Sequence, residues 1–103
     1  MLDRVKNALR SCSNNVHHYT GGGASAPYIV WAEDSRNDHY SENHHGEKAW
    51  MGTIDLFSKD EDDPLRDEIE DALDKAGISW YLNSVQYEDD TKLIHTEWVF
   101  EVS

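Results

Sequence analysis

The chain has 103 residues, enough for one domain with one modest core, and 9 Lys and Arg against 21 Asp and Glu give a net charge of −12. That charge repels nucleic-acid phosphates and argues against tightly held DNA or RNA, while no apolar run approaches the roughly 20 residues that span a bilayer. The single cysteine excludes an internal disulfide and a multi-cysteine zinc site.

The N-terminal segment 2–12 has the spacing of a short amphipathic helix. Apolar side chains recur there at intervals of three and four, at Leu2, Val5, Leu9 and Cys12. Residues 13–26 are polar and contain three consecutive glycines at 21–23, which maximise the backbone entropy lost on ordering. We therefore expect 13–26 to be a flexible loop.

Two predicted strands follow, separated by polar sequence. Residues 28–31 are β-branched and aromatic, and residues 49–57 alternate with a period of two. The segment 34–47 between them is almost purely polar, so it predicts a long loop or a hairpin tip that reaches away from the core. The simplest arrangement pairs the two strands antiparallel.

The segment 64–76 carries the best-defined helix signals in the chain. Pro64 fits the first helical position, and an aspartate just before it can accept hydrogen bonds from exposed amides. Gly77 suits a left-handed C-terminal cap. Beyond it, Ile78, Trp80 and Leu82 alternate, and Val85 and Tyr87 continue out of phase, which predicts a bulge near 83–84. A turn at 88–91 precedes a last strand over 94–102.

These elements predict an α+β fold in the order α-β-β-α-β-β. Four mainly antiparallel strands would form one sheet, with two helices packed on one face. Four Trp and five Tyr supply most of the large apolar surface, so the core should be built on aromatic side chains. The whole chain, 1–103, is expected to be a single domain.

The histidines are the first residues to consider as metal ligands. His39, His44 and His45, with Asp38 and Glu42 nearby, could hold zinc or nickel. Adjacent residues on a strand point to opposite faces, however, and a flexible loop loses entropy when it is ordered around an ion, so a solvated loop is favoured. The acidic run 60–63 lacks the glycine of a calcium loop and is better explained as a helix cap. We expect no metal ligand.

Catalytic motifs are also lacking. Cys12 lies on an apolar helix stripe, where a buried and inert thiol is expected, and His95 is expected on the polar face of a strand. The sequence has no nucleophile elbow, phosphate loop or dinucleotide fingerprint. One or two of the four tryptophans could serve a protein interface. We therefore predict no enzyme, no catalytic residue and no cofactor.

Several short runs together resemble the tail-terminator proteins of long-tailed bacteriophages and prophages, which are also called tail-completion or head–tail joining proteins. These runs are PYIVW (27–31), TIDLFSK (53–59), EIEDAL (68–73), AGI (76–78), YED (87–89) and FEV (100–102). The resemblance implies a structural protein of the virion. It would form a hexameric ring that caps the tail tube at its head-proximal end and joins it to the head–tail connector.

The same resemblance implies partners and a location. The partners are copies of the chain itself, the tail-tube protein and the connector proteins, with no membrane, and the chain would be made in the bacterial host cytoplasm. Genomic DNA would pass through an acidic lumen without sticking. The charge also fits an alternative, an acidic mimic of DNA that inhibits a DNA-binding protein as a monomer or dimer. A metal-dependent hydrolase using the histidine loop is a third, weaker alternative.

Overall fold

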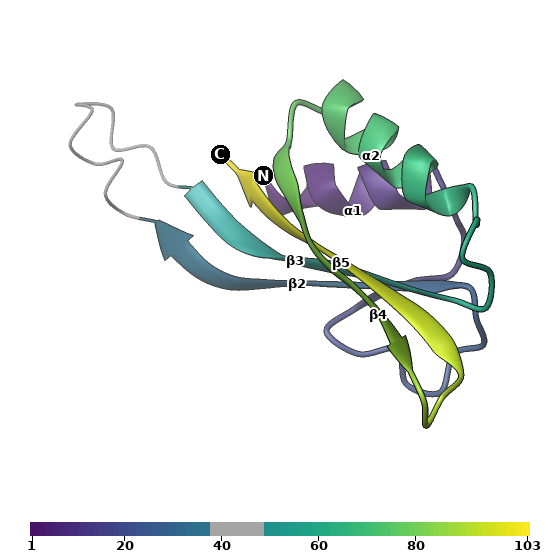
Figure 1. The fold of residues 1–103 in the computed structure, drawn as a ribbon. Coiled ribbons are helices and arrows are strands. Elements are labelled where there is room, and N and C mark those ends of the chain that lie inside the picture. The colour runs from purple at the N-terminus through teal and green to yellow at the C-terminus, as the bar shows by residue number, and fades with distance from the viewer. Residues whose placement is uncertain (38–48) are drawn as a thin grey trace, which may run out of the picture.

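The computed structural model describes residues 1–37 and 49–103, which form two helices and one five-stranded sheet (Figure 1). The elements in chain order are α1 (Leu2–Arg10), β1 (Val16–His18), β2 (Tyr28–Asn37), β3 (Ala49–Ser58), α2 (Leu65–Lys75), β4 (Ser79–Glu88) and β5 (Leu93–Val102). The strand order is β1-β2-β3-β5-β4. Both helices lie on one face of the sheet, and the described residues leave the other face open. The predicted α+β class is confirmed and the four predicted strands pair antiparallel, but the predicted order α-β-β-α-β-β lacks β1, which makes the sheet five-stranded. No described helix is long and apolar enough to cross a membrane.

The first correction concerns β1, which lies inside the segment 13–26 that was expected to be a loop. β1 pairs in parallel with β2, Val16 opposite Ile29 and His18 opposite Trp31, so the sheet is mixed and has five strands. The Asn15 side chain donates to the carbonyl oxygens of Ser25 and Pro27 at 2.8 and 3.0 Å, which closes the intervening loop. A three-residue strand held by such distant partners leaves no periodic pattern in the sequence.

The second correction concerns β2, which continues to Asn37 although 34–47 was expected to be loop or hairpin tip. Its antiparallel pairing with β3 passes through a bulge between Glu33 and Ser35 and ends with Asn37 opposite Ala49. Backbone pairing therefore outweighs the polar character of these residues. The remainder of the predicted loop, with His39, His44 and His45, lies outside the described residues.

Gly52 on β3 lies where the β2 bulge brings two backbones unusually close. A Cβ atom at this position would lie 2.0 Å from the carbonyl oxygen of Ala32, 2.8 Å from Cα of Glu33 and 2.8 Å from Cε2 of Phe100. Two of these three atoms belong to the backbone and cannot move aside by a side-chain rotation. The close approach of β2 to β3 therefore requires glycine.

The two ends of α2 follow the local signals in the sequence. The backbone N–H of Leu65 donates to Oδ1 of Asp63 at 2.9 Å, so the aspartate before Pro64 caps the helix. At the other end Gly77 has a φ of +70°, and the N–H of Ile78 donates to the carbonyl oxygen of Leu73 at 3.0 Å. This is the Schellman arrangement that a glycine at this position favours. α1 is shorter than predicted and ends at Arg10, whereas a helix to residue 12 was expected.

The core lies between the helices and the sheet, and its largest fully buried side chains are those of Trp98 and Phe100. The Trp98 indole N–H donates to Oε2 of Glu70 at 2.9 Å, and the Trp80 indole N–H donates to Oδ1 of Asp74 at 2.8 Å. One turn of α2 thus accepts hydrogen bonds from β5 and from β4. These bonds fix the position of α2 along the direction of the strands and hold the helix against the sheet.

Candidate functional site

Two features of the described residues stand out as candidate sites: a polar cluster on the open face of the sheet and the outer edge of β4. The open-face cluster consists of Asp55, Glu88, His95 and Glu97. Asp55 on β3 lies opposite Glu97 on β5. The strands alternate, so the neighbours of these residues, such as Ile54 and Trp98, are buried under the helices while the cluster points the other way.

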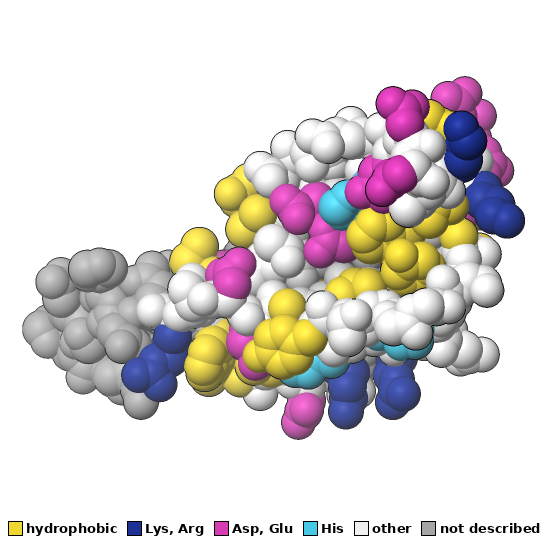
Figure 2. Space-filling model, turned by 90° about the horizontal axis from the view of Figure 1, so that it is seen from below, with side chains coloured by type: hydrophobic (Ala, Val, Ile, Leu, Met, Phe, Trp, Pro, Cys, Tyr) yellow, Lys and Arg dark blue, Asp and Glu magenta, His cyan; other side chains and the backbone are white. Residues whose placement is uncertain are grey.

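Seen from the open face, acidic side chains gather around a histidine, with hydrophobic side chains beside them (Figure 2). His95 is the centre of the open-face cluster, because both of its ring nitrogens face a carboxylate. Nε2 lies 2.6 Å from Oδ1 of Asp55, and Nδ1 lies 3.3 Å from Oε2 of Glu88. On the far side of Asp55, the Asn83 side-chain amide donates to Oε1 of Glu97 at 2.8 Å.

The open-face cluster is half-buried although it lies on an exposed sheet face. The side chains of Asp55 and His95 are 15% and 23% accessible. The Phe57 ring stacks on the His95 imidazole with centroids 4.3 Å apart, and the Tyr28 ring stacks in turn on Phe57 at 4.8 Å. This aromatic row shields one side of the imidazole from water and holds its plane.

Hydrogen bonds, burial and neighbouring charges shift the pKa values of two groups in the cluster, His95 and Glu97. The hydrogen bond with Asp55 raises the pKa of His95 above its ordinary value, burial opposes that rise, and the charges of Asp55, Glu88 and Glu97 add to it. Burial also raises the pKa of Glu97, and the hydrogen bond of Glu97 with Asp55 raises it further. Among the described residues, His95 is the one cationic partner of these carboxylates in an ion pair. Negative charge is therefore in excess around a single imidazole.

The second feature is β4, which lies at one edge of the sheet and is paired on one side alone among the described residues. It exposes four large hydrophobic side chains: Tyr81 at 57%, Leu82 at 43%, Val85 at 44% and Tyr87 at 58%. Its ten residues include no Pro, Lys or Arg, the usual residues that block edge pairing. The predicted bulge is confirmed, since the register shifts between Leu82 and Ser84.

Other residues singled out in the sequence have structural roles. Cys12 is half-buried between the helices, where its thiol donates to the carbonyl oxygen of Glu68 at 3.4 Å, and burial raises its pKa. Asp63 from the acidic run caps α2. His18, which the sequence placed in a loop, stacks on Trp31 with centroids 4.0 Å apart and lies 2.7 Å from Oε1 of Glu33.

The open-face cluster was not predicted as a site from the sequence. His95 was expected on the polar face of its strand, and it lies on the open face of the sheet. The missing information was that β5 inserts between β3 and β4, which brings residues forty positions apart to within 2.6 Å. No family model and no curated protein sequence matches the chain.

Proposed function

We propose that this chain is a self-assembling structural subunit that pairs through the outer edge of β4, and that its assembly is the ring of a phage tail terminator. The observation that carries the proposal is the β4 edge. A ten-residue outer strand with four exposed large hydrophobic side chains is a template for pairing with another chain. A partner strand would satisfy the outward backbone groups and cover these side chains together.

The two edges of the sheet differ, and this difference favours a ring over a two-fold dimer. At the edge opposite β4, the three-residue strand β1 covers β2 at residues 29–31, and β2 runs on to Asn37. Joining unlike edges is a head-to-tail contact, which closes into a ring when the rotation between subunits allows it. Pairing of β4 with the β2 edge of the next copy is consistent with the hexamer that the sequence resemblance implies.

The charge of the subunit suits a passage for DNA. Seven exposed acidic side chains run along the loop before α2 and the outer side of that helix: Asp60, Glu61, Asp62, Asp67, Glu68, Asp71 and Asp74. With this acidic ridge turned inward, a ring would present negative charge to DNA, which would then pass without being held. The proposed location is the head-proximal end of the tail, against the tail-tube and connector proteins.

The assembly interface is tested by native mass spectrometry with an edge variant. The parent chain should form six-subunit rings at high concentration or on contact with tail-tube protein. Val85→Lys should abolish them, because a buried lysine at the contact is unpaired. Asn7→Lys on α1 is the matched control, since it makes the same charge change at another exposed position. Parent chains that stay monomeric with tail-tube protein, or rings that tolerate Val85→Lys, would contradict the proposed interface.

The biological role is tested by deleting the coding sequence from the phage or prophage genome that carries it. Filled heads beside overlong or unattached tails would support a terminator. Normal virions would contradict it.

The acidic ridge also supports the second candidate, a DNA mimic. A mimic needs many exposed carboxylates, and the acidic ridge supplies seven of them within residues 60–74. The two candidates separate on one variant, Asp67→Asn with Asp71→Asn. A mimic should lose binding to its DNA-binding partner, with a steep dependence on salt, whereas ring formation through β4 should be unchanged.

A further inference from the structure

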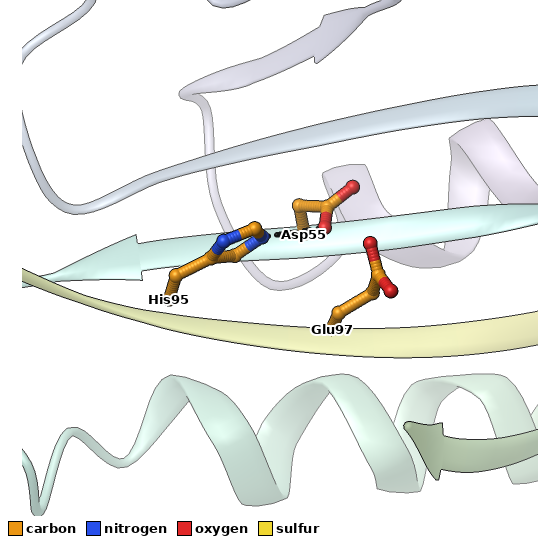
Figure 3. Close-up of side chains that lie close together, drawn as sticks. All are labelled: Asp55, His95 and Glu97. Carbon is orange, nitrogen blue, oxygen red and sulfur yellow. Dashed lines mark hydrogen bonds and ion pairs between the residues drawn. The ribbon is translucent and has the colours of Figure 1, made fainter. Parts of the chain in front are cut away.

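Three side chains of the open-face cluster have the composition and spacing of a metal site (Figure 3). One ligand atom each from Asp55, His95 and Glu97 can be chosen such that all three lie within 4.8 Å of one another. We propose that these three residues bind a divalent transition-metal ion of the zinc class, with His95 as a ligand through Nε2. This inference does not depend on the proposed ring.

The donor set selects the class of ion. One imidazole nitrogen and two carboxylate oxygens are ligands that Zn²⁺ accepts at about 2.0–2.2 Å, with water completing its coordination. Magnesium and calcium prefer oxygen ligands alone, so the imidazole argues for a transition metal. An ion would also offset the excess negative charge of carboxylates whose one described cationic partner is His95.

The residues that contact the proposed ligands, Glu88 and Asn83, are of the kind that orient ligands in metal sites. Oε2 of Glu88 lies 3.3 Å from Nδ1 of His95, so Nδ1 can donate its proton to Glu88 and leave the Nε2 lone pair for the metal. The Asn83 amide holds Oε1 of Glu97 at 2.8 Å and leaves its other oxygen unengaged by that bond. A carboxylate behind the histidine and an amide behind the glutamate orient both ligands.

The backbone limits how far the ligands must move. All three come from β3 and β5, which pair without interruption from Trp50–Val102 to Ser58–Ile94. Tetrahedral zinc places its ligand atoms about 3.3 Å apart. The contact of 2.6 Å between Asp55 and His95 must therefore open, and Glu97 must move in. Rotations of the Asp55 and Glu97 side chains supply both changes while the Phe57 stack holds the imidazole plane.

The experiment separates this site from the other histidines of the chain. The full chain is stripped with a chelator, dialysed and titrated with ZnCl₂ by isothermal calorimetry. A loop variant, with His39, His44 and His45 changed to Gln, removes the ligands that the sequence itself suggested. We expect the loop variant to bind one Zn²⁺ per chain. Failure of the loop variant to bind zinc would overturn the proposal.

Further substitutions in the loop-variant background identify the ligands. Glu97→Gln and His95→Gln should each weaken zinc binding by at least about tenfold, and Glu88→Gln, which acts through His95, by about 10- to 100-fold. His18→Gln is the matched control, because His18 also faces a carboxylate but has no second one beside it among its described contacts. Thermal melts by circular dichroism identify any variant that fails to fold. If His95→Gln fails to fold, Glu97→Gln still tests the site, because it leaves the His95–Asp55 pair intact. Unchanged zinc affinity in folded His95→Gln or Glu97→Gln would refute the site.

Nitrogen NMR of the histidine rings gives a readout that a structural role would not produce. Zinc should shift the Nε2 resonance of His95 to the metal-bound range while Nδ1 stays protonated toward Glu88. Binding with no change at His95 would overturn the assignment. Val85→Lys should bind zinc like the parent, so that failure of the ring and failure of the metal site remain distinguishable.

Discussion

Gly52→Ala should be among the most destabilising small substitutions in this chain. The added Cβ would lie 2.0 Å from the carbonyl oxygen of Ala32, and atoms in contact prefer about 3.5 Å or more, so β2 would have to retreat by about 1.5 Å. Overpacking a dense region costs about 1–3 kcal/mol in stability. Because two of the three atoms that the new Cβ would meet belong to the backbone, the cost here should lie at the upper end of that range. We expect a loss of about 3 kcal/mol, a large part of the stability of a small domain.

Urea denaturation followed by circular dichroism measures this loss, and Gly21→Ala is the matched control. At Gly21 the nearest contact is at 2.7 Å, but it is Cε2 of the Tyr28 ring, a side chain that can move. The control should cost less than about 1 kcal/mol. If Gly52→Ala were as stable as Gly21→Ala, the close approach of β2 to β3 at the bulge would be wrong.

Three further predictions concern other parts of the chain. Leu73→Ala on α2 should cost about 2–5 kcal/mol in urea denaturation, because Leu73 is fully buried, and a variant as stable as the parent would show that α2 does not pack as described. Burial raises the pKa of Glu33, but hydrogen bonds from His18, its own backbone and Tyr19 outweigh burial and lower the pKa below 4.5. The stability that this lowered pKa contributes is present above the pKa of Glu33 in the unfolded chain and is lost as the pH falls through its pKa in the folded chain. In His18→Ala, a carboxyl ¹³C titration should show the pKa of Glu33 returning toward its ordinary value. Burial raises the pKa of Cys12, so a thiol reagent at pH 8 should react faster with the chain in urea than with the folded chain, and equal rates would contradict the packing of the thiol.

Elements whose determinants are local in sequence could be predicted from the sequence. The cap from Asp63, the position of Pro64 and the left-handed Gly77 lie within α2 or next to it, so they predicted both of its ends. The bulge in β4 was predicted in the same way, because a change of phase between Leu82 and Val85 is visible in the sequence itself.

Elements that depend on distant partners could not be predicted. β1 is a strand because Val16 and its neighbours pair with β2, and the polar end of β2 is a strand because β3 is opposite it. The open-face cluster has the same cause. The outward direction of Asp55, His95 and Glu97 follows from alternation, but their proximity follows from the insertion of β5 beside β3. The sequence-based expectation of no metal ligand rested on the loop histidines and on the acidic run 60–63, and it did not consider these three residues together.

The two indole hydrogen bonds to α2 have a consequence for how this protein can be observed. The N–H protons of Trp98 and Trp80 are both held by carboxylates on one turn of the helix, at Glu70 and Asp74. Release of α2 from the sheet would free both protons, whereas an event confined to the sheet edge would reach Trp80 on β4 first. Hydrogen exchange at these two indole resonances, in a uniformly ¹⁵N-labelled sample, would therefore distinguish opening of the helix layer from events at the edge, with no engineered probe.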